Sequence, residues 1–164
     1  MTAAAAAALR GGDIDAAALG GIANSVGAAE GLTLPGMSRP VRAINPNFPP
    51  SQAGVDAMNS VGIRNMANDI RCVDCNEIAE SMLRTSNGEG RILEARPLSS
   101  GNLNVFENGS LEPGQWYHQV YTDGRYVFDP RLSPTPVPKG DWLQHIRGIN
   151  PDRVIFPSKP KGFP

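Results

Sequence analysis

Three side chains of this sequence are of the types that thiol catalysis needs. Cys72 stands at the head of a segment with the apolar spacing of a helix, whereas His118 and Asp129 lie in a segment with the pattern of a β-hairpin. A thiol nucleophile needs a base to take its proton, and the base needs a partner that fixes its ring. We therefore expect Cys72 as nucleophile, His118 as general base and Asp129 as the residue that orients the base.

The hairpin predicts how His118 and Asp129 meet. Asp123-Gly124 is typical of a two-residue type I′ turn, because both central positions of that turn need a positive φ. With these two residues as the loop, His118 lies directly opposite Asp129, where Cβ atoms are roughly 4.5–5.5 Å apart. The carboxylate would then fix the tautomer of the imidazole and stabilise the imidazolium. Taken alone, the hairpin favours a purely structural contact between strands, and the cysteine-bearing helix shifts the balance toward catalysis. A slip of one residue would separate the pair.

The choice between the two cysteines depends on where the helix begins. An apolar stripe with helical spacing runs through Cys75, Ile78, Ala79, Met82 and Leu83. Cys75 is therefore expected to be a buried packing residue, and it is kept as the alternative nucleophile. Cys72 is expected at or just before the first helical position, where unpaired N–H groups and the helix dipole favour a thiolate. The same N–H groups are suited to hold an oxyanion.

Three other interpretations of the cysteines stay open. A redox pair would need a βαβ context, which the sequence pattern does not show. A zinc site would use Cys72, Cys75, His118 and His145, but the separation of the two histidines is far longer than in zinc fingers. Both cysteines would serve only in packing in the third interpretation. We expect neither a metal nor another cofactor.

Length and composition limit the class of protein. The chain has 164 residues and a net charge of −1, which predicts about one domain. Its pI near 6.1 gives no basic footprint for nucleic acid. No stretch approaches the roughly 20 apolar residues of a membrane span. Two cysteines three positions apart do not form a disulfide framework.

The composition changes along the chain. Residues 1–43 are rich in Ala, Gly and Pro, and we expect a lead-in that is flexible or the remnant of a preceding domain, with a short helix over Asp13–Leu19. Residues 44–164 are expected to form the catalytic domain. Its elements are predicted at Cys72–Thr85 (helix), Arg91–Ala95 (strand), Trp116–Pro130 (hairpin), Gly140–Ile146 (helix capped by Asp141) and Val154–Phe156 (edge strand). A cysteine-bearing helix packed on an antiparallel sheet is an α+β domain.

The order of these motifs resembles the papain-like/transglutaminase-like superfamily. The matching segments are Ile44–Phe48, Arg71–Cys75 and His118–Pro130. Within the superfamily, the chain is similar to the papain-fold toxin domains of bacterial polymorphic toxins, including toxin glutamine deamidases. The resemblance implies a papain-like fold and a triad of Cys72, His118 and Asp129. The chain departs from the family pattern at Arg71, where Asn is frequent, and at Arg131, where Gln is frequent.

The chemistry that the resemblance implies is acyl transfer. His118 would take the thiol proton, and Cys72 would attack a carbonyl carbon. Residues expected near the oxyanion or the substrate are Asn65, Asn68 and Trp116, although amide side chains at such positions more often serve only as polar surface groups. Tyr117 and Trp142 are further candidates to line the cleft, although aromatic side chains beside a hairpin more often lie in the core. A glutamine side chain as substrate gives deamidation, which the resemblance favours. A main-chain carbonyl would make the enzyme a protease, and an amine acceptor would make it a transglutaminase.

The resemblance also implies partners and a place of action. A toxin of this type is secreted or delivered into a target cell, acts in its cytoplasm on a target-cell protein, and is bound by a cognate immunity protein. No nucleic acid and no membrane span are expected. Two alternatives of another class stay open, namely a non-catalytic binding module and a nuclease toxin. The nuclease would use His118, His145, Arg125 and Arg131.

Overall fold

The computed structural model describes residues 31–98, 103–152 and 154–158. The helix expected over Asp13–Leu19 lies outside these residues. The described helices are α2 (Gln52–Asn59), α3 (Val61–Asn68), α4 (Cys75–Thr85) and α5 (Lys139–Ile149). The strands are β1 (Arg91–Pro97), β2 (Leu103–Glu107), β3 (Ser110–Gln115), β4 (His118–Thr122), β5 (Tyr126–Phe128), β6 (Val137–Pro138) and β7 (Val154–Ile155).

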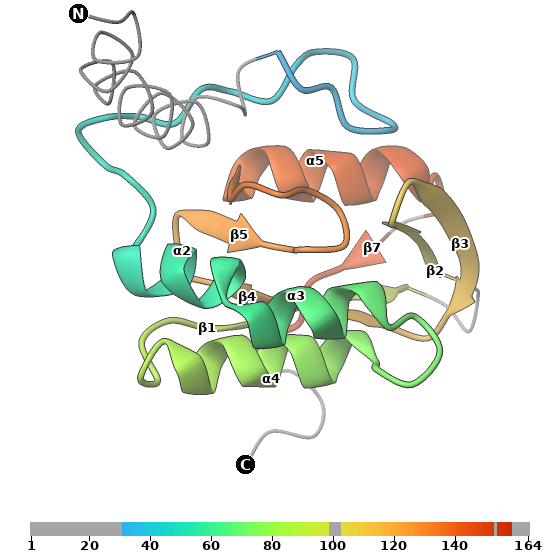
Figure 1. The fold of residues 1–164 in the computed structure, drawn as a ribbon. Coiled ribbons are helices and arrows are strands. Elements are labelled where there is room, and N and C mark those ends of the chain that lie inside the picture. The colour runs from blue at the N-terminus through green and yellow to red at the C-terminus, as the bar shows by residue number, and fades with distance from the viewer. Residues whose placement is uncertain (1–30, 99–102, 153, 159–164) are drawn as a thin grey trace, which may run out of the picture.

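The strands form two antiparallel sheets. The main sheet has the order β6-β5-β4-β1-β7, and β2 and β3 form a separate two-stranded sheet. Figure 1 shows α5 on one side of the main sheet and α4 on the other. This arrangement confirms the expected α+β class and the packing of the cysteine-bearing helix on an antiparallel sheet.

The main sheet is covered on both faces, and each face has its own apolar core. The face toward α2, α3 and α4 is filled by side chains that include Met58, Ile78, Met82, Tyr121 and Phe128. The opposite face is filled by side chains that include Leu93, Val120, Val127, Trp142 and Ile146. Because successive strand residues point to opposite faces, β4 contributes Tyr121 to the first core and Val120 to the second. His118 therefore projects to the same face as Val120, toward α5.

The segment before residue 43 belongs to the folded domain. Leu34 and Val41 are each only 3% exposed and lie in the core on the α5 side. The buried Asp141 at the start of α5 accepts hydrogen bonds from the Arg39 side chain, at 2.6 Å, and from the Arg42 backbone N–H, at 2.7 Å. The domain thus begins N-terminal to the boundary expected at residue 43, because this segment supplies apolar and charged side chains that α5 needs as partners.

The β4–β5 hairpin differs from its predicted register by two residues. The observed pairs are Tyr121 with Phe128 and Thr122 with Val127. His118 is therefore a diagonal neighbour of Asp129 and does not lie directly opposite it. A shift of two residues leaves every side chain on its original face, so the expected meeting of His118 and Asp129 survives the wrong register.

The Asp123 side chain explains the wider hairpin loop. Its Oδ1 accepts hydrogen bonds from the backbone N–H groups of Arg125, at 2.9 Å, and Tyr126, at 2.8 Å. Gly124 still takes a positive φ of 102°. The carboxylate closes a longer loop than a type I′ turn, because it replaces backbone bonds with its own.

Candidate active site

The N-terminus of α4 places Cys75, not Cys72, at the first helical position. Asp74 is the N-cap, and its backbone N–H donates to Glu77 Oε2 at 2.8 Å as part of a capping box. The expectation that the helix begins at Cys72 is therefore wrong by three residues. The signal was available, because an Asp followed three positions later by Glu is the pattern of a capping box.

Cys72 lies in the turn between α3 and α4. Its side chain is exposed, and its backbone N–H donates to Asp69 Oδ1 at 3.1 Å. Cys72 does not line either of the hollows that contain His118. The position that the sequence assigned to the nucleophile is thus separated from the expected base, and the alternative nucleophile Cys75 takes its place beside His118.

His118 begins β4 and connects the thiol to Asp129. Its Nε2 lies 2.9 Å from Asp129 Oδ2, and the imidazole and carboxylate are both buried. The Cys75 side chain lines the same two hollows as the ring and contributes to its electrostatic surroundings. Since Nε2 is occupied by Asp129, Nδ1 is the nitrogen left for the thiol. The structure therefore brings together the side chains of Cys75, His118 and Asp129, an arrangement that can serve chemically as nucleophile, base and orienting carboxylate.

The charges of this trio favour the ionised pair. Burial alone would lower the pKa of His118, but Asp129 and Cys75 outweigh it and raise the pKa well above its ordinary value. Burial alone would raise the pKa of Asp129, but His118 and the Trp142 indole N–H lower it. Both directions have the same physical cause, the attraction between an imidazolium and a carboxylate.

The Trp142 side chain of α5 packs against the His118–Asp129 pair. Its ring stacks on the imidazole, with 6.2 Å between ring centroids and 24° between planes. Its Nε1–H donates to Asp129 Oδ2 at 3.3 Å, and the side chain is fully buried. Of the two places open to Trp142, the cleft wall and the core, the structure shows the core. Its side chain contacts both His118 and Asp129, because α5 packs against that face of the sheet.

An open cleft of about 220 Å³ leads to the thiol and the imidazole. Its lining includes Cys75 and His118 together with Glu107, Trp116 and Tyr117. Trp116 is 77% exposed and lines this cleft. Burial and the nearby Cys75 raise the pKa of Tyr117, whose ring also lies at the cleft.

Asn65 and Asn68 are not brought to the cleft. Both side chains are exposed on α3. Asn68 lines a different hollow, together with Pro130 and Pro134. Their expected contact with the oxyanion or the substrate is therefore not found, since α3 turns these positions away from the thiol.

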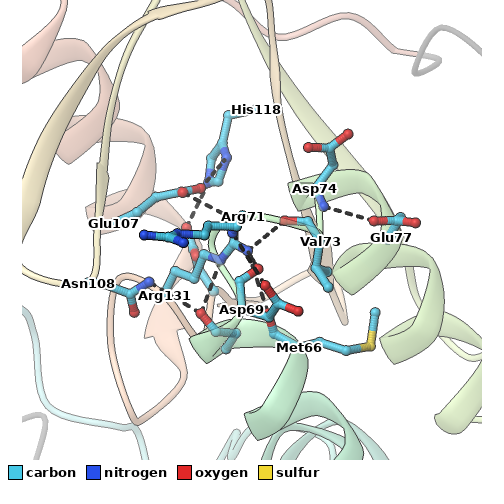
Figure 2. A network of polar contacts seen from close by, with 12 residues as sticks. Met66, Asp69, Arg71, Val73, Asp74, Glu77, Glu107, Asn108, His118 and Arg131 are labelled. Atoms are coloured by element: carbon cyan, nitrogen blue, oxygen red, sulfur yellow. Dashed lines mark hydrogen bonds and ion pairs between the residues drawn. The ribbon is translucent and has the colours of Figure 1, made fainter.

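Arg131 and Glu107 form a network beside the trio that the sequence did not predict (Figure 2). The buried Arg131 donates from Nε to the Ala67 carbonyl at 3.2 Å and from Nη2 to the Asp69 carbonyl at 3.1 Å and the Val73 carbonyl at 2.6 Å. These carbonyls lie at the end of α3 and in the turn that leads to α4, where backbone acceptors lack helical partners. In the sequence, Arg131 stands out as a departure from the family pattern and as a residue of the nuclease alternative, and neither predicts this network.

Neither a metal centre nor a membrane span is found in the part of the chain that the structure describes. No three His, Cys, Asp or Glu side chains in it converge on a point that would hold a metal ion. None of its helices combines the length and the apolar character needed to cross a bilayer.

Comparison with known proteins adds no relative. No protein-family model, curated protein or solved structure matches this chain. Inference about its function therefore depends on the geometry of the cleft and on the resemblance of its motifs.

Proposed function

We propose that this protein is a thiol-dependent acyl-transfer enzyme, with Cys75 as nucleophile, His118 as general base and Asp129 as the orienting carboxylate. The observation that carries the proposal is the chain of contacts from the Cys75 side chain through His118 to Asp129, at the edge of an open cleft. The cysteine-bearing α4 packed on an antiparallel sheet also supports the papain-like arrangement that the motifs resemble.

Two features favour a reactive thiolate at Cys75. The first N–H groups of a helix have no partner within the helix, and the helix dipole stabilises a negative charge there. The protonated His118 adds a positive charge within hydrogen-bonding reach. Both features place positive potential beside the Cys75 sulfur, which suits a nucleophilic role.

The reaction proceeds by two proton transfers through His118. The Cys75 thiolate attacks the carbonyl carbon of a carboxamide, a C–S bond forms, and N–H groups at the start of α4 stabilise the oxyanion. The imidazolium gives its proton to the leaving nitrogen as the C–N bond breaks, which releases ammonia. Neutral His118 then takes a proton from water, the resulting hydroxide attacks the thioester, and the C–S bond breaks. The products are a carboxylic acid and the regenerated pair.

A glutamine side chain of a target-cell protein is the substrate that the resemblance to toxin deamidases favours. The same attack on a main-chain carbonyl would be proteolysis, and an amine in place of water would give transglutamination. The cleft is open to solvent and carries an exposed Trp116, which suits a side chain on a protein surface. An immunity protein that covers the cleft in the producing cell belongs to the same proposal, as does delivery into the cytoplasm of a target cell.

The nuclease alternative has less support from the arrangement of its residues. His145 is buried, and its Nδ1 lies 2.7 Å from the Pro35 carbonyl oxygen. The Arg131 guanidinium is also buried and is bonded to backbone carbonyls and to Glu107. Neither side chain is free to contact a phosphate.

Mass spectrometry of target-cell proteins tests the proposal. A gain of about one mass unit on a glutamine indicates deamidation by the thiol chemistry, and a new chain terminus indicates proteolysis. Cys75→Ala is expected to abolish either product, whereas Cys72→Ala serves as the matched control and retains it. Undiminished activity or toxicity of Cys75→Ala would exclude the thiol mechanism.

A further inference from the structure

Glu107 lies at the end of β2 and contacts groups on two sides. Its Oε1 is 3.7 Å from His118 Nδ1, and its Oε2 is 3.2 Å from Arg131 Nη1. The Glu107 side chain is 16% exposed, so water screens these charges only in part. Figure 2 shows the carboxylate between the imidazole and the guanidinium.

The contacts of Glu107 with Arg131 and with His118 are of different types. At 3.2 Å the contact with Arg131 is a hydrogen bond, whereas 3.7 Å to His118 Nδ1 is too long for one. A carboxylate at that distance still attracts the positive charge of the ring. Nδ1 is also the nitrogen that serves the thiol, because Asp129 occupies Nε2. A shorter contact with Glu107 would therefore compete with Cys75 for the same proton.

Arg131 is held too firmly to follow Glu107. Its Nε and Nη2 groups donate to carbonyls of Ala67, Asp69 and Val73, and its own backbone oxygen accepts from the Asn108 N–H at 2.7 Å. Asn108 follows Glu107 directly in the turn between β2 and β3. The Arg131 guanidinium binds the Glu107 side chain, and the Arg131 backbone oxygen binds the N–H of the next residue. The position of Glu107 is thus determined from both ends.

We propose that Glu107 is a positioning residue of this site, which stabilises the protonated His118 beside Cys75 while Arg131 keeps its carboxylate out of hydrogen-bonding distance. The inference rests on the proposed function, and it adds a second carboxylate to the trio. Asp129 orients the ring at Nε2, and Glu107 supplies charge on the side of Nδ1. Arg131 holds the Glu107 carboxylate too far from Nδ1 for a hydrogen bond, so Nδ1 stays available to the Cys75 thiol.

The charged and titratable groups around His118 come from several elements. Cys75 faces it from α4, Glu107 from β2 and Asp129 from the end of β5, while His145 of α5 lies within electrostatic range. Arg131 neutralises part of the Glu107 charge. Because Asp129 is untouched by a change at Glu107, such a change should alter the charge balance and leave the orientation of the ring intact.

Glu107→Gln tests the proposal, because it removes the charge and keeps the shape. The titration of His118 is followed by the NMR signal of its ring C–H. We expect its midpoint to fall by about one pH unit, the usual spread that protein surroundings impose on histidine. Glu112→Gln removes the same charge from the exposed β3 of the same hairpin and should leave the midpoint in place. An unmoved His118 midpoint in Glu107→Gln would overturn the role of Glu107.

The role of Arg131 is tested by a pair of variants. Arg131→Lys cannot serve the carbonyls and Glu107 at once, because lysine lacks the planar fork of donors. Glu107 then reaches Nδ1 and draws the imidazolium away from the thiol. The alkylation rate of Cys75 at neutral pH should therefore fall on the order of tenfold. Adding Glu107→Gln should restore most of the rate. A double variant no faster than Arg131→Lys would overturn this role.

The two proposals fail in different ways. If the Cys75 of the unaltered protein reacts with iodoacetamide only as an ordinary free thiol, the acyl-transfer function loses its basis. The His118 midpoint measures the effect of Glu107 in either case, since it needs no substrate and no turnover.

Discussion

Replacing Asp129 by Asn perturbs the centre of the site with the smallest change of shape. The His118 Nε2 and Asp129 Oδ2 atoms are 2.9 Å apart, and both side chains are buried. At an effective dielectric constant of about 20, two unit charges at this distance attract by about 6 kcal/mol, and desolvation offsets part of this. Removing one partner of a buried ion pair costs about 3–5 kcal/mol of stability. We expect Asp129→Asn to lower the free energy of unfolding by about 3–5 kcal/mol at pH 5–6.

The dependence of this loss on pH follows from the two pKa directions. The folded-state pKa of His118 is raised, so its contribution is complete below the unfolded value of about 6.5 and disappears as the pH rises through the folded value. The pKa of Asp129 is lowered, so its contribution is complete above about 3.9 and disappears as the pH falls through the folded value. The difference between the two proteins should therefore be largest at pH 5–6 and shrink in alkaline solution.

Urea unfolding at a series of pH values measures this difference directly. Asp152→Asn is the matched control, since Asp152 is exposed beyond the end of α5 and should show little effect. The same Asp129→Asn protein should lose acyl-transfer activity by about 10²–10⁴-fold, the usual contribution of general acid–base catalysis. A stability loss that stays constant from pH 5 into the alkaline range would refute the ion-pair reasoning.

Three further predictions concern the thiol, the tryptophan and the helix cap. Iodoacetamide should label Cys75 faster than Cys72 near neutral pH, although Cys72 is more exposed, and peptide mapping of the labelled protein decides this. Trp142→Phe keeps a ring beside the imidazole but loses the hydrogen bond to Asp129; thermal unfolding should show a loss of about 1 kcal/mol, and NMR should show a changed His118 midpoint. Asp74→Ala removes the helix cap next to Cys75 and should cost about 1 kcal/mol in urea unfolding, whereas an unchanged stability would argue against the capping box.

Local patterns in the sequence were sufficient for the class of fold and for one half of the site. The Asp123-Gly124 turn signal predicts a hairpin, and the stripe from Cys75 to Leu83 predicts a helix, because both depend on neighbouring residues in the chain. The same-face placement of His118 and Asp129 also followed, since strand parity is unaffected by a shift of two residues. The capping pattern of Asp74 and Glu77 is also local, and it places the start of the helix at Cys75.

The tertiary structure decided which thiol meets the base and what holds the base in place. Cys75 reaches His118 only because α4 packs against β4, and no spacing within either segment specifies that contact. Trp142 and Glu107 come from α5 and β2, far from His118 in the chain or on a different sheet, and their contacts depend on how these elements pack. Periodicity determines local elements and faces, whereas the surroundings of a buried charge are determined by residues that only folding brings together.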